Sequence, residues 1–246
     1  RRGRRAGLQG GAAPCSRGRR ERGVAAVRIE HAPHPFPGRL VVVCGPDGVG
    51  KSTLLDALQP VAEERWEVVR TAQPTSWWRT DRRVRAALRR GEEEPLTRLN
   101  LALFGLLDRL QHQADLIEPA LAAGKLVLSD RYSYSTFAHY MADPAWQDWE
   151  LMQALAARLY APDAGLVLVD DAAAVVRRVT ARDGADPRAY DQDLGFVRMQ
   201  LGAFADIAAS NRLVLVDAGA GAEGCAAQAV GALCDRGILH AAAGRF

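Results

Sequence analysis

The chain has 246 residues, 48% of them hydrophobic and 25% charged, which is the composition of a globular protein with a single α/β core. Its apolar runs are too short to cross a membrane, so we expect no membrane partner. The formal charge is +3, but residues 1–26 hold eight arginines and one glutamate, a net +7, so the other 220 residues carry −4. This excludes a basic nucleic-acid-binding surface on the folded part, and we expect no nucleic-acid partner. The four cysteines show neither metal-ligand spacing nor a disulfide framework, which predicts reduced thiols and a cytoplasmic location.

Residues 1–38 are rich in Arg, Gly, Ala and Pro and have no apolar periodicity, so we expect a disordered basic leader. Three origins are open: a targeting peptide, a basic arm that binds nucleic acid, or translated upstream sequence that the native protein lacks. We favour the third, because the Arg/Ala/Gly bias is typical of a GC-rich genome and the chain does not begin with Met. The native start then lies near Val27, which an intact mass of natively expressed protein tests.

A phosphate-binding loop stands between a predicted strand at residues 39–44 and a predicted helix from residue 52. The strand is an apolar run of the kind buried on both faces of a parallel sheet, and leucines follow the loop at helical spacing. Glycines let the loop wrap around a phosphate, Lys51 can reach the β and γ oxygens, and the Ser52 hydroxyl can hold magnesium. The alternative is a glycine-rich turn without a ligand. The nucleotide-binding residues are predicted to be Gly45, Pro46, Asp47, Gly48, Val49, Gly50, Lys51, Ser52 and Thr53.

The rest of the chain alternates strands with helices. Further strands are predicted at residues 66–71, 125–129, 165–169 and 213–216. Helices are predicted at residues 81–90, 95–123, 133–160 (two helices, broken near 143–144), 172–181, 191–210 and 222–236. The alternation predicts a five-stranded parallel, doubly wound sheet. The helix at 95–123 carries an apolar stripe that we expect to be buried, formed by Leu96, Leu99, Leu103, Leu106, Leu107, Leu110, Ile117 and Leu121.

Polar residues at the ends of these elements are candidates for a second phosphate site. Asp130 and Arg131 follow the third strand at its carboxyl end, where magnesium and a second phosphate would lie beside the loop. A surface ion pair is the alternative. The charged segment at 182–188 is a candidate lid or an ordinary solvated loop. Trp77 and Trp78, after the second strand, either pack in the core or line a pocket.

Together these motifs resemble the thymidylate kinases of the nucleoside-monophosphate kinase group over residues 39–235. The resemblance is carried by Asp47 in the loop, the helix segments 107–112 and 117–121, residues 130–135 (Asp-Arg-Tyr-x-x-Ser) with Ala138, and the Pro-Asp pair at 162–163. It implies a P-loop NTPase fold of the nucleoside-monophosphate kinase type. The kinase domain would span residues 39–240, with a short lid at about 182–190. It also implies a homodimer.

The resemblance further implies a role for each matching residue. Lys51 and the loop amides would bind ATP, with Mg²⁺ on Ser52 and on Asp130, either directly or through water. Arg182 and Arg188 would close over the transferring phosphoryl group, because Gly48 stands where other members have a loop arginine. Residues implied in acceptor binding are Asp47, Phe104, Arg109 (reading the base edge), Arg131 (clamping the 5′-phosphate), Ser135, His139 and Asp191.

Three departures fall on the acceptor side. The family usually has Arg-Glu-Pro-Gly-Gly after the second strand, where this chain has residues 71–75, Thr-Ala-Gln-Pro-Thr. The family's stacking phenylalanine is Gly105 here, so Phe104, Trp77 or Trp78 must substitute if the base is to stack, and the family's Ala-Tyr-Gln becomes Ala-His-Tyr at 138–140. The function implied first is transfer of the ATP γ-phosphoryl to dTMP, giving dTDP. The alternatives are a related kinase of another nucleotide or nucleoside-like metabolite, and a nucleotide-binding regulatory protein.

Overall fold

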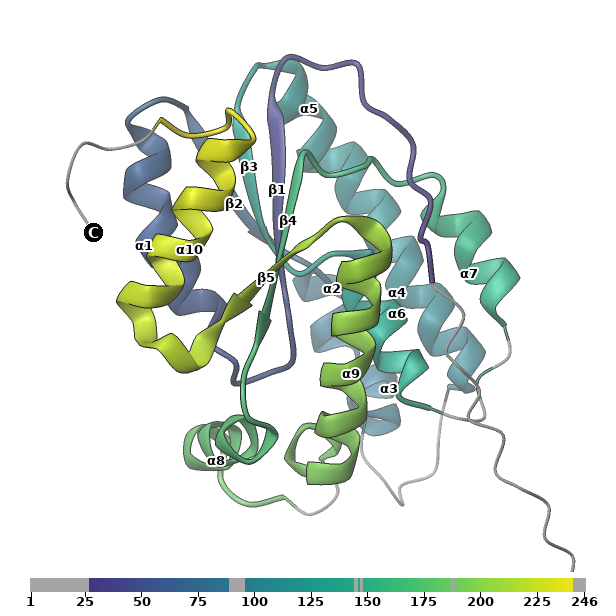
Figure 1. Cartoon of the computed structure of the whole chain (residues 1–246). Helices are drawn as coiled ribbons and strands as arrows, with labels where there is room; N and C mark the ends of the chain where they lie inside the picture. Colours follow the sequence, from purple (N-terminus) through teal and green to yellow (C-terminus); the bar gives the residue numbers. More distant parts are fainter. Residues whose placement is uncertain (1–26, 89–95, 144–145, 147, 187–188, 241–246) are drawn as a thin grey trace, which may run out of the picture.

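The computed structural model describes residues 27–88, 96–143, 146, 148–186 and 189–240, and its core is a five-stranded sheet (Figure 1). The order across the sheet is β2-β3-β1-β4-β5, and every neighbouring pair is parallel. The predicted parallel sheet is confirmed. Its strands are β1 (Arg39–Cys44), β2 (Val68–Ala72), β3 (Leu126–Asp130), β4 (Ala164–Val169) and β5 (Val214–Asp217).

The central strand β1 is buried on both faces because it is apolar at successive positions. Residues 40–44 are fully buried. Leu40, Val42 and Cys44 belong to one apolar cluster, and Val41 and Val43 belong to the cluster on the opposite face. Each buried Val or Leu side chain contributes about 1.5–3 kcal/mol relative to an exposed one, which places β1 in the middle of the sheet rather than at an edge.

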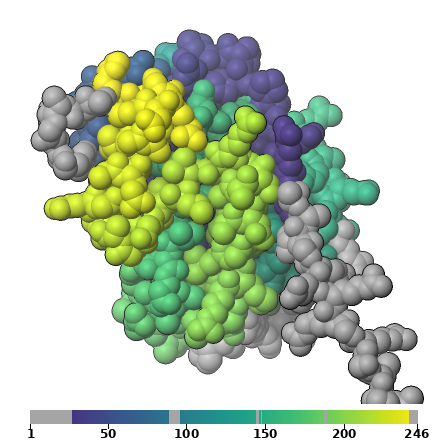
Figure 2. All heavy atoms as spheres, viewed as in Figure 1, coloured from purple at the N-terminus to yellow at the C-terminus, as the bar shows by residue number. Residues whose placement is uncertain are grey.

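Helices cover both faces of the sheet (Figure 1). One face carries α1 (Lys51–Glu63) and α10 (Gly221–Asp235). The other carries α4 (Arg98–His112), α5 (Glu118–Ala122), α6 (Ser133–Met141), α7 (Trp149–Ala156) and α9 (Leu194–Asn211). Figure 2 shows α9 and α10 at the molecular surface. In the part of the chain that the structure describes, none of the helices combines the length and apolar character needed to span a membrane.

The single helix predicted at 95–123 is instead α4, a π-helical turn η1 (Gln113–Ile117) and α5. The wider turn directs Gln113 inward, where its Oε1 accepts from the Tyr160 backbone N–H (2.7 Å) and its Nε2 donates to the Arg158 carbonyl (3.1 Å). The predicted stripe is also wrong at Leu107, which is 52% exposed. The face of α4 that turns inward there carries polar groups of the candidate site.

Between β2 and α4 the chain forms two short helices, α2 (Ser76–Thr80) and α3 (Arg82–Ala87). The predicted helix at 81–90 is confirmed over 82–87, and residues 89–90 lie outside the described part. A cis peptide bond joins Gln73 to Pro74 just before α2. Further short turns are η2 (Tyr190–Gln192) and η3 (Ala218–Ala220), and α8 (Ala172–Asp183) follows β4.

The N-terminal segment 27–38 does not fit the predicted disorder. Ile29 is buried, and its N–H donates to Asn211 Oδ1 (2.7 Å) on α9. Ala32 forms a parallel bridge with Tyr160. The segment is held because its backbone finds partners on elements far along the sequence, which local composition does not reveal. Residues 1–26 lie outside the described residues.

Candidate active site

The loop of residues 45–50 joins the carboxyl end of β1 to the start of α1. Gly45 and Gly48 have φ angles of 141° and 75°, which favour glycine. A Cβ on Gly48 would lie 2.6 Å from Val179 Cγ2 of α8, so a larger residue would collide with that helix. Among the described residues no side chain caps α1, and its first-turn N–H groups are therefore available to an anion.

Lys51 begins α1 and is only 6% exposed. Its ammonium donates to the Pro46 carbonyl (2.7 Å) and lies 3.9 Å from Asp47 Oδ1. Burial, together with the nearby charge of Arg131, lowers the pKa of Lys51 to about 8. The lysine is thus held across the loop as a buried cation that an incoming phosphate would stabilise.

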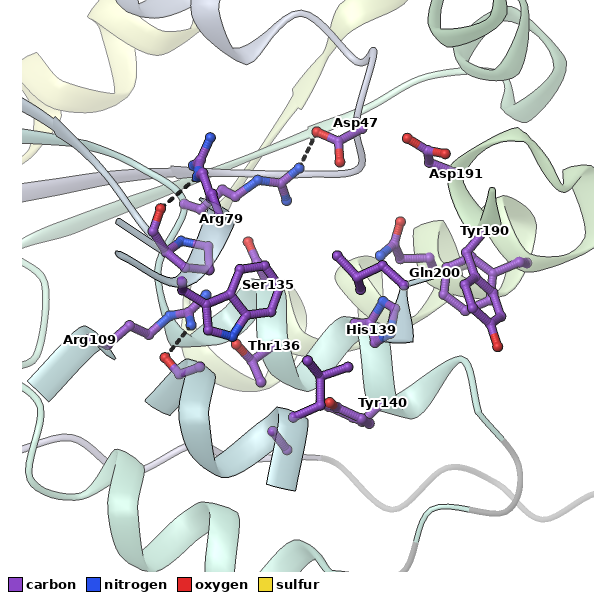
Figure 3. Close-up of a pocket in the computed structure, with 18 residues that line it drawn as sticks. Asp47, Arg79, Arg109, Ser135, Thr136, His139, Tyr140, Tyr190, Asp191 and Gln200 are labelled. Atoms are coloured by element: carbon purple, nitrogen blue, oxygen red, sulfur yellow. Dashed lines mark hydrogen bonds and ion pairs between the residues drawn. The ribbon is translucent and has the colours of Figure 1, made fainter. Parts of the chain in front are cut away.

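Arg131 connects the end of β3 with the loop. Its backbone N–H donates to the Val43 carbonyl (2.8 Å), and its φ of 72° is left-handed, a conformation that costs a non-glycine residue about 1–3 kcal/mol and gathers at functional sites. The guanidinium pairs with Asp47 and donates to the Gly45 carbonyl (3.2 Å). Figure 3 shows the Asp47 contact as a dashed line. Arg131 therefore bridges the loop and the cavity described below.

The Asp47 carboxylate responds to the charge of Arg131. Burial opposes ionisation of Asp47, but Arg131 and Lys51 hold the pKa of Asp47 well below its usual value. Asp130 Oδ1 is buried without a hydrogen-bond partner in the described structure, and Ser52 is exposed at the first turn of α1. A hydroxyl and a carboxylate supply the hard oxygen ligands that Mg²⁺ prefers, so these residues fit the ion.

Beside the loop lies a cavity of about 370 Å³ (Figure 3). Its walls come from four places in the chain: the segment after β2, α4, α6, and the segment leading into α9. Asp47 and Arg131 close it at the loop end. The other lining residues are Pro74, Trp78, Arg79, Leu88, Leu101, Ala102, Gly105, Arg109, Ser135, Thr136, His139, Tyr140, Tyr190, Asp191, Phe196 and Gln200.

Arg109 enters the cavity wall from α4 although it is only 2% exposed. Its Nη1 donates to the Gly105 carbonyl (2.7 Å), while Nε has no partner in the described structure. Burial lowers the pKa of Arg109 to about 10, a value at which it stays charged at neutral pH. The neighbouring Asp108 accepts from the Thr75 N–H (2.8 Å) and hydroxyl, which attaches the start of α2 to α4.

The opposite wall is aromatic and neutral. His139 contacts Phe196 and Tyr140, with ring centroids 5.2 and 5.1 Å apart. Burial, assisted by the charge of Arg131, lowers the pKa of His139 to about 4, so the imidazole is uncharged at neutral pH.

Two carboxylates lie at one end of the cavity. Burial and the charge of Asp47 raise the pKa of Asp191, and Figure 3 shows both carboxylates at the same end of the cavity. A cation bound at this end would relieve their repulsion.

The predicted lid is described in part. Arg182 lies at the end of α8, exposed and paired with Asp183 (2.5 Å). Arg188 lies outside the described residues. Gln192 spans the segment by accepting from the Asp186 N–H and donating to the Gly184 carbonyl, both at 2.8 Å. In the described part, therefore, Arg182 pairs with its neighbour rather than with a residue of the loop.

The sequence model of the family described as Thymidylate kinase matches residues 43–228. The chain belongs to the thymidylate kinase family. Among curated relatives, a thymidylate kinase of Akkermansia muciniphila is 36% identical over 203 residues, which are 81% of this chain and 93% of that protein. A probable thymidylate kinase of Halorubrum lacusprofundi is 35% identical over 191 residues, 73% of this chain and 89% of that protein. A thymidylate kinase of Exiguobacterium sibiricum is 35% identical over 103 residues, which span about half of that relative (48%) and 42% of this chain.

The structure gathers most of the site residues expected from the thymidylate kinase resemblance. Asp47, Arg109, Arg131, Ser135, His139 and Asp191 all line the cavity. Phe104 does not. It lies on the far side of α4, with its ring 4.9 Å from that of Trp77 in an edge-to-face contact. Consecutive helical residues point about 100° apart, so a phenylalanine next to Gly105 cannot take the place of a side chain at Gly105.

Sequence reasoning named Trp78 as one of three residues that could stack on the base, and it missed other residues that line the cavity or contact the loop. Trp78 and Arg79 reach the cavity from α2, and Gln200 reaches it from α9. Arg178 of α8 donates to the Gly48 carbonyl (3.4 Å) and pairs with Asp170 (2.6 Å), which places a further cation at the loop. The adjacent tryptophans were a visible signal, but only the packing of α2 against α4 distinguishes the residue in the cavity from the one outside it.

The depressed pKa of Lys51 predicts a proton linkage in this thymidylate kinase family member. ATP favours the ammonium form, so affinity should weaken as pH rises from 7 to 9, and binding at pH 8 should take up about half a proton. At pH 6.5, uptake by Lys51 should be near zero. Titration calorimetry in buffers of different ionisation enthalpy measures this uptake. Lys51→Arg is the control, because its side chain is charged at both pH values; the same uptake in that variant at pH 8 would contradict the assignment.

Proposed function

We propose that this chain transfers the γ-phosphoryl group of ATP to dTMP, giving dTDP and ADP. Membership of the thymidylate kinase family supports an ATP-dependent phosphotransferase. The observation that carries the proposal is the position of Arg131, whose guanidinium touches the phosphate-binding loop at Asp47 and Gly45 and also lines the cavity. A cation shared by two sites suits a reaction that brings two phosphates together.

The reaction needs positioning and neutralisation of charge more than it needs a nucleophilic side chain. An oxygen of the acceptor phosphate attacks the γ-phosphorus, and the bond from that phosphorus to the β–γ bridging oxygen breaks, leaving ADP. Lys51 and the first-turn N–H groups of α1 would hold the donor phosphates, and Arg131 would hold the acceptor phosphate. Arg109 would donate to the base edge deeper in the cavity.

Magnesium is the metal that this site suits best. Ser52 and Asp130 would hold it, with Asp130 acting directly or through bound water, because these two residues present hydroxyl and carboxylate oxygens near the loop. The ion would supply charge stabilisation on the donor oxygens. Arg182 and Arg188 remain candidates for closing over the transferred group: Arg182 pairs with Asp183 outside the cavity, and Arg188 lies outside the described residues.

The direct test is ADP release from ATP and Mg²⁺ with dTMP, and then with dUMP, dCMP, dGMP and AMP in turn. We expect dTMP to give the highest kcat/KM. Absence of ADP release with all five acceptors, together with measurable ATP binding, would reject phosphotransfer to these nucleoside monophosphates, leaving a nucleoside-like acceptor or a nucleotide-binding regulatory protein.

A second candidate function is transfer to another nucleoside monophosphate or a nucleoside-like metabolite. The observation that favours it is the set of departures from the family pattern: Gly105 and His139 line the cavity, and Gln73 directly precedes the lining residue Pro74. Gln73 is fully buried, and neither polar atom of its side chain has a partner in the described structure. Higher kcat/KM with another acceptor in the same assay would support this function over dTMP phosphorylation.

We further propose that the chain forms a homodimer through a surface on α2, α4 and α7. Trp77, Leu107 and Leu151 are 51%, 52% and 43% exposed there, and Leu103, Phe104 and Leu155 line the same groove. An exposed apolar surface of this kind supports an interface. Sedimentation of wild type and Leu107→Glu tests it: the wild type should be dimeric and the variant monomeric.

A cytoplasmic location is consistent with the free thiols of Cys44, Cys225 and Cys234.

A further inference from the structure

The cavity contains an aromatic side chain that no motif assigns. Trp78 lines it from α2 and is half-buried. A Cβ added to Gly105 would lie 3.5 Å from Trp78 Nε1 and 3.4 Å from Arg109 Nη1. The indole and the guanidinium therefore meet over the same point of α4. A Cβ at that point would be in ordinary van der Waals contact with both groups, so a larger side chain such as phenylalanine would compete with them for space.

The other aromatic side chains of the cavity pack against neighbouring rings. His139, Tyr190 and Phe196 form mutual ring contacts at 5.1 to 6.2 Å, and the ring centroid of Tyr140 lies 4.1 Å from that of Trp146. Trp78, by contrast, has no ring neighbour among the described residues. In the described part of the chain, Trp78 therefore lines the cavity without another aromatic ring stacked on its indole.

The position of α2 is fixed independently of any ligand. Thr75, its N-cap, donates its N–H and its hydroxyl to Asp108, which is 1% exposed on α4. The indole thus lies on a helix that is anchored to the one carrying Arg109. This arrangement orients a flat apolar surface before a substrate arrives, which reduces the entropy lost on binding.

We infer that Trp78 is the stacking residue for the acceptor base, and that the absence of a side chain at Gly105 leaves the space for its indole. This inference rests on the proposed function. The base would lie against the indole, while Arg109, beside the same glycine, would donate to its edge. Because every base has a π face, stacking on Trp78 favours all nucleoside monophosphates alike, whereas discrimination between them belongs to the edge donor.

The test compares Trp78→Ala with Trp77→Ala, since both residues lie on α2 but Trp77 contacts Phe104 outside the cavity. Trp78→Ala should raise the acceptor KM about 10-fold or more for dTMP and by a similar factor for the other accepted monophosphates. The KM for ATP should stay within about 2-fold of wild type. Trp77→Ala should leave the acceptor KM within about 2-fold of wild type.

A reciprocal exchange keeps the inference testable if Trp78→Ala is poorly folded. Gly105→Phe alone should weaken acceptor binding because the ring collides with the indole, and the double variant Trp78→Ala/Gly105→Phe should recover at least part of the loss. Equal acceptor KM values in wild type and a folded Trp78→Ala would overturn the inference while leaving phosphotransfer intact. Absence of wild-type turnover with any monophosphate would instead reject the proposed function.

Discussion

Lys51→Ala is expected to reduce kcat for phosphoryl transfer by about 10²–10³-fold, because the variant loses the cation that meets the charge developing on the donor phosphates. The fold should remain intact. Burial lowers the pKa of Lys51 to about 8, so the unfolded chain binds more protons than the folded one between pH 8 and the ordinary lysine pKa. Wild-type stability therefore rises with pH across that window, and the alanine variant should lose this rise.

The matched control is Lys125→Ala, because Lys51 and Lys125 are the two lysines of the chain. Lys125 precedes β3 at the end opposite to Arg131 and pairs with Glu67. Steady-state kinetics and thermal melts from pH 7 to 10 provide both readouts. Near-wild-type turnover in Lys51→Ala would remove the phosphate-binding role, whereas an equal loss in both variants would point to a nonspecific effect.

Arg131→Ala is expected to lower kcat/KM for the acceptor by about 10- to 150-fold, the effect of losing a charge-assisted contact of about 1.5–3 kcal/mol. The Kd of ATP should change far less. Removing the guanidinium also leaves Lys51, 3.9 Å away, as the remaining ion-pair partner of Asp47, so the pKa of Asp47 should rise toward its ordinary value. Acceptor kinetics measure the loss in kcat/KM, and direct ATP titration measures the change in the Kd of ATP.

Two further variants sharpen the reading of Arg131. Arg131→Lys keeps the charge but loses the planar guanidinium, so its kcat/KM for the acceptor should lie between the values of wild type and Arg131→Ala. Arg39→Ala removes a surface arginine that pairs with Asp163 at the opposite end of β1. It should leave both kcat/KM for the acceptor and the Kd of ATP unchanged. Equal losses of ATP and acceptor binding in Arg131→Ala would mean that the guanidinium serves the donor phosphates instead.

The parts of the site that sequence reasoning found are those set by local chemistry. Lys51 and Ser52 follow a glycine-rich turn, and Asp130 and Arg131 end a strand. Parallel strands place their carboxyl ends at one edge of the sheet, so the two motifs were expected to meet, and Arg131 does contact Asp47. The candidate lid segment was predicted from its charge and turn formers, and the family resemblance implied the roles of Arg182 and Arg188; Arg182 pairs with Asp183 in the described structure.

Errors arose where helix geometry or contacts with distant segments decide the outcome. Phe104 was a reasonable stacking candidate by proximity to Gly105, yet helix rotation turns it toward Trp77. Residues 27–38 looked disordered by composition, yet Asn211 and Tyr160 supply partners for their backbone. Leu107 belonged to the apolar stripe by spacing, but the inward face of α4 is committed to Asp108 and Arg109.

The sequence by itself determined the strand, loop and helix that hold a phosphate, the alternation that makes a parallel sheet, and the cation at the end of β3. These depend on backbone freedom and side-chain periodicity, which act between near neighbours in the chain. Only the tertiary structure decided which tryptophan enters the cavity, that Gly105 makes room for it, and that Arg109 stands beside it. Those choices depend on how α2 packs against α4 through Thr75 and Asp108, a contact between separate segments that local propensity does not encode.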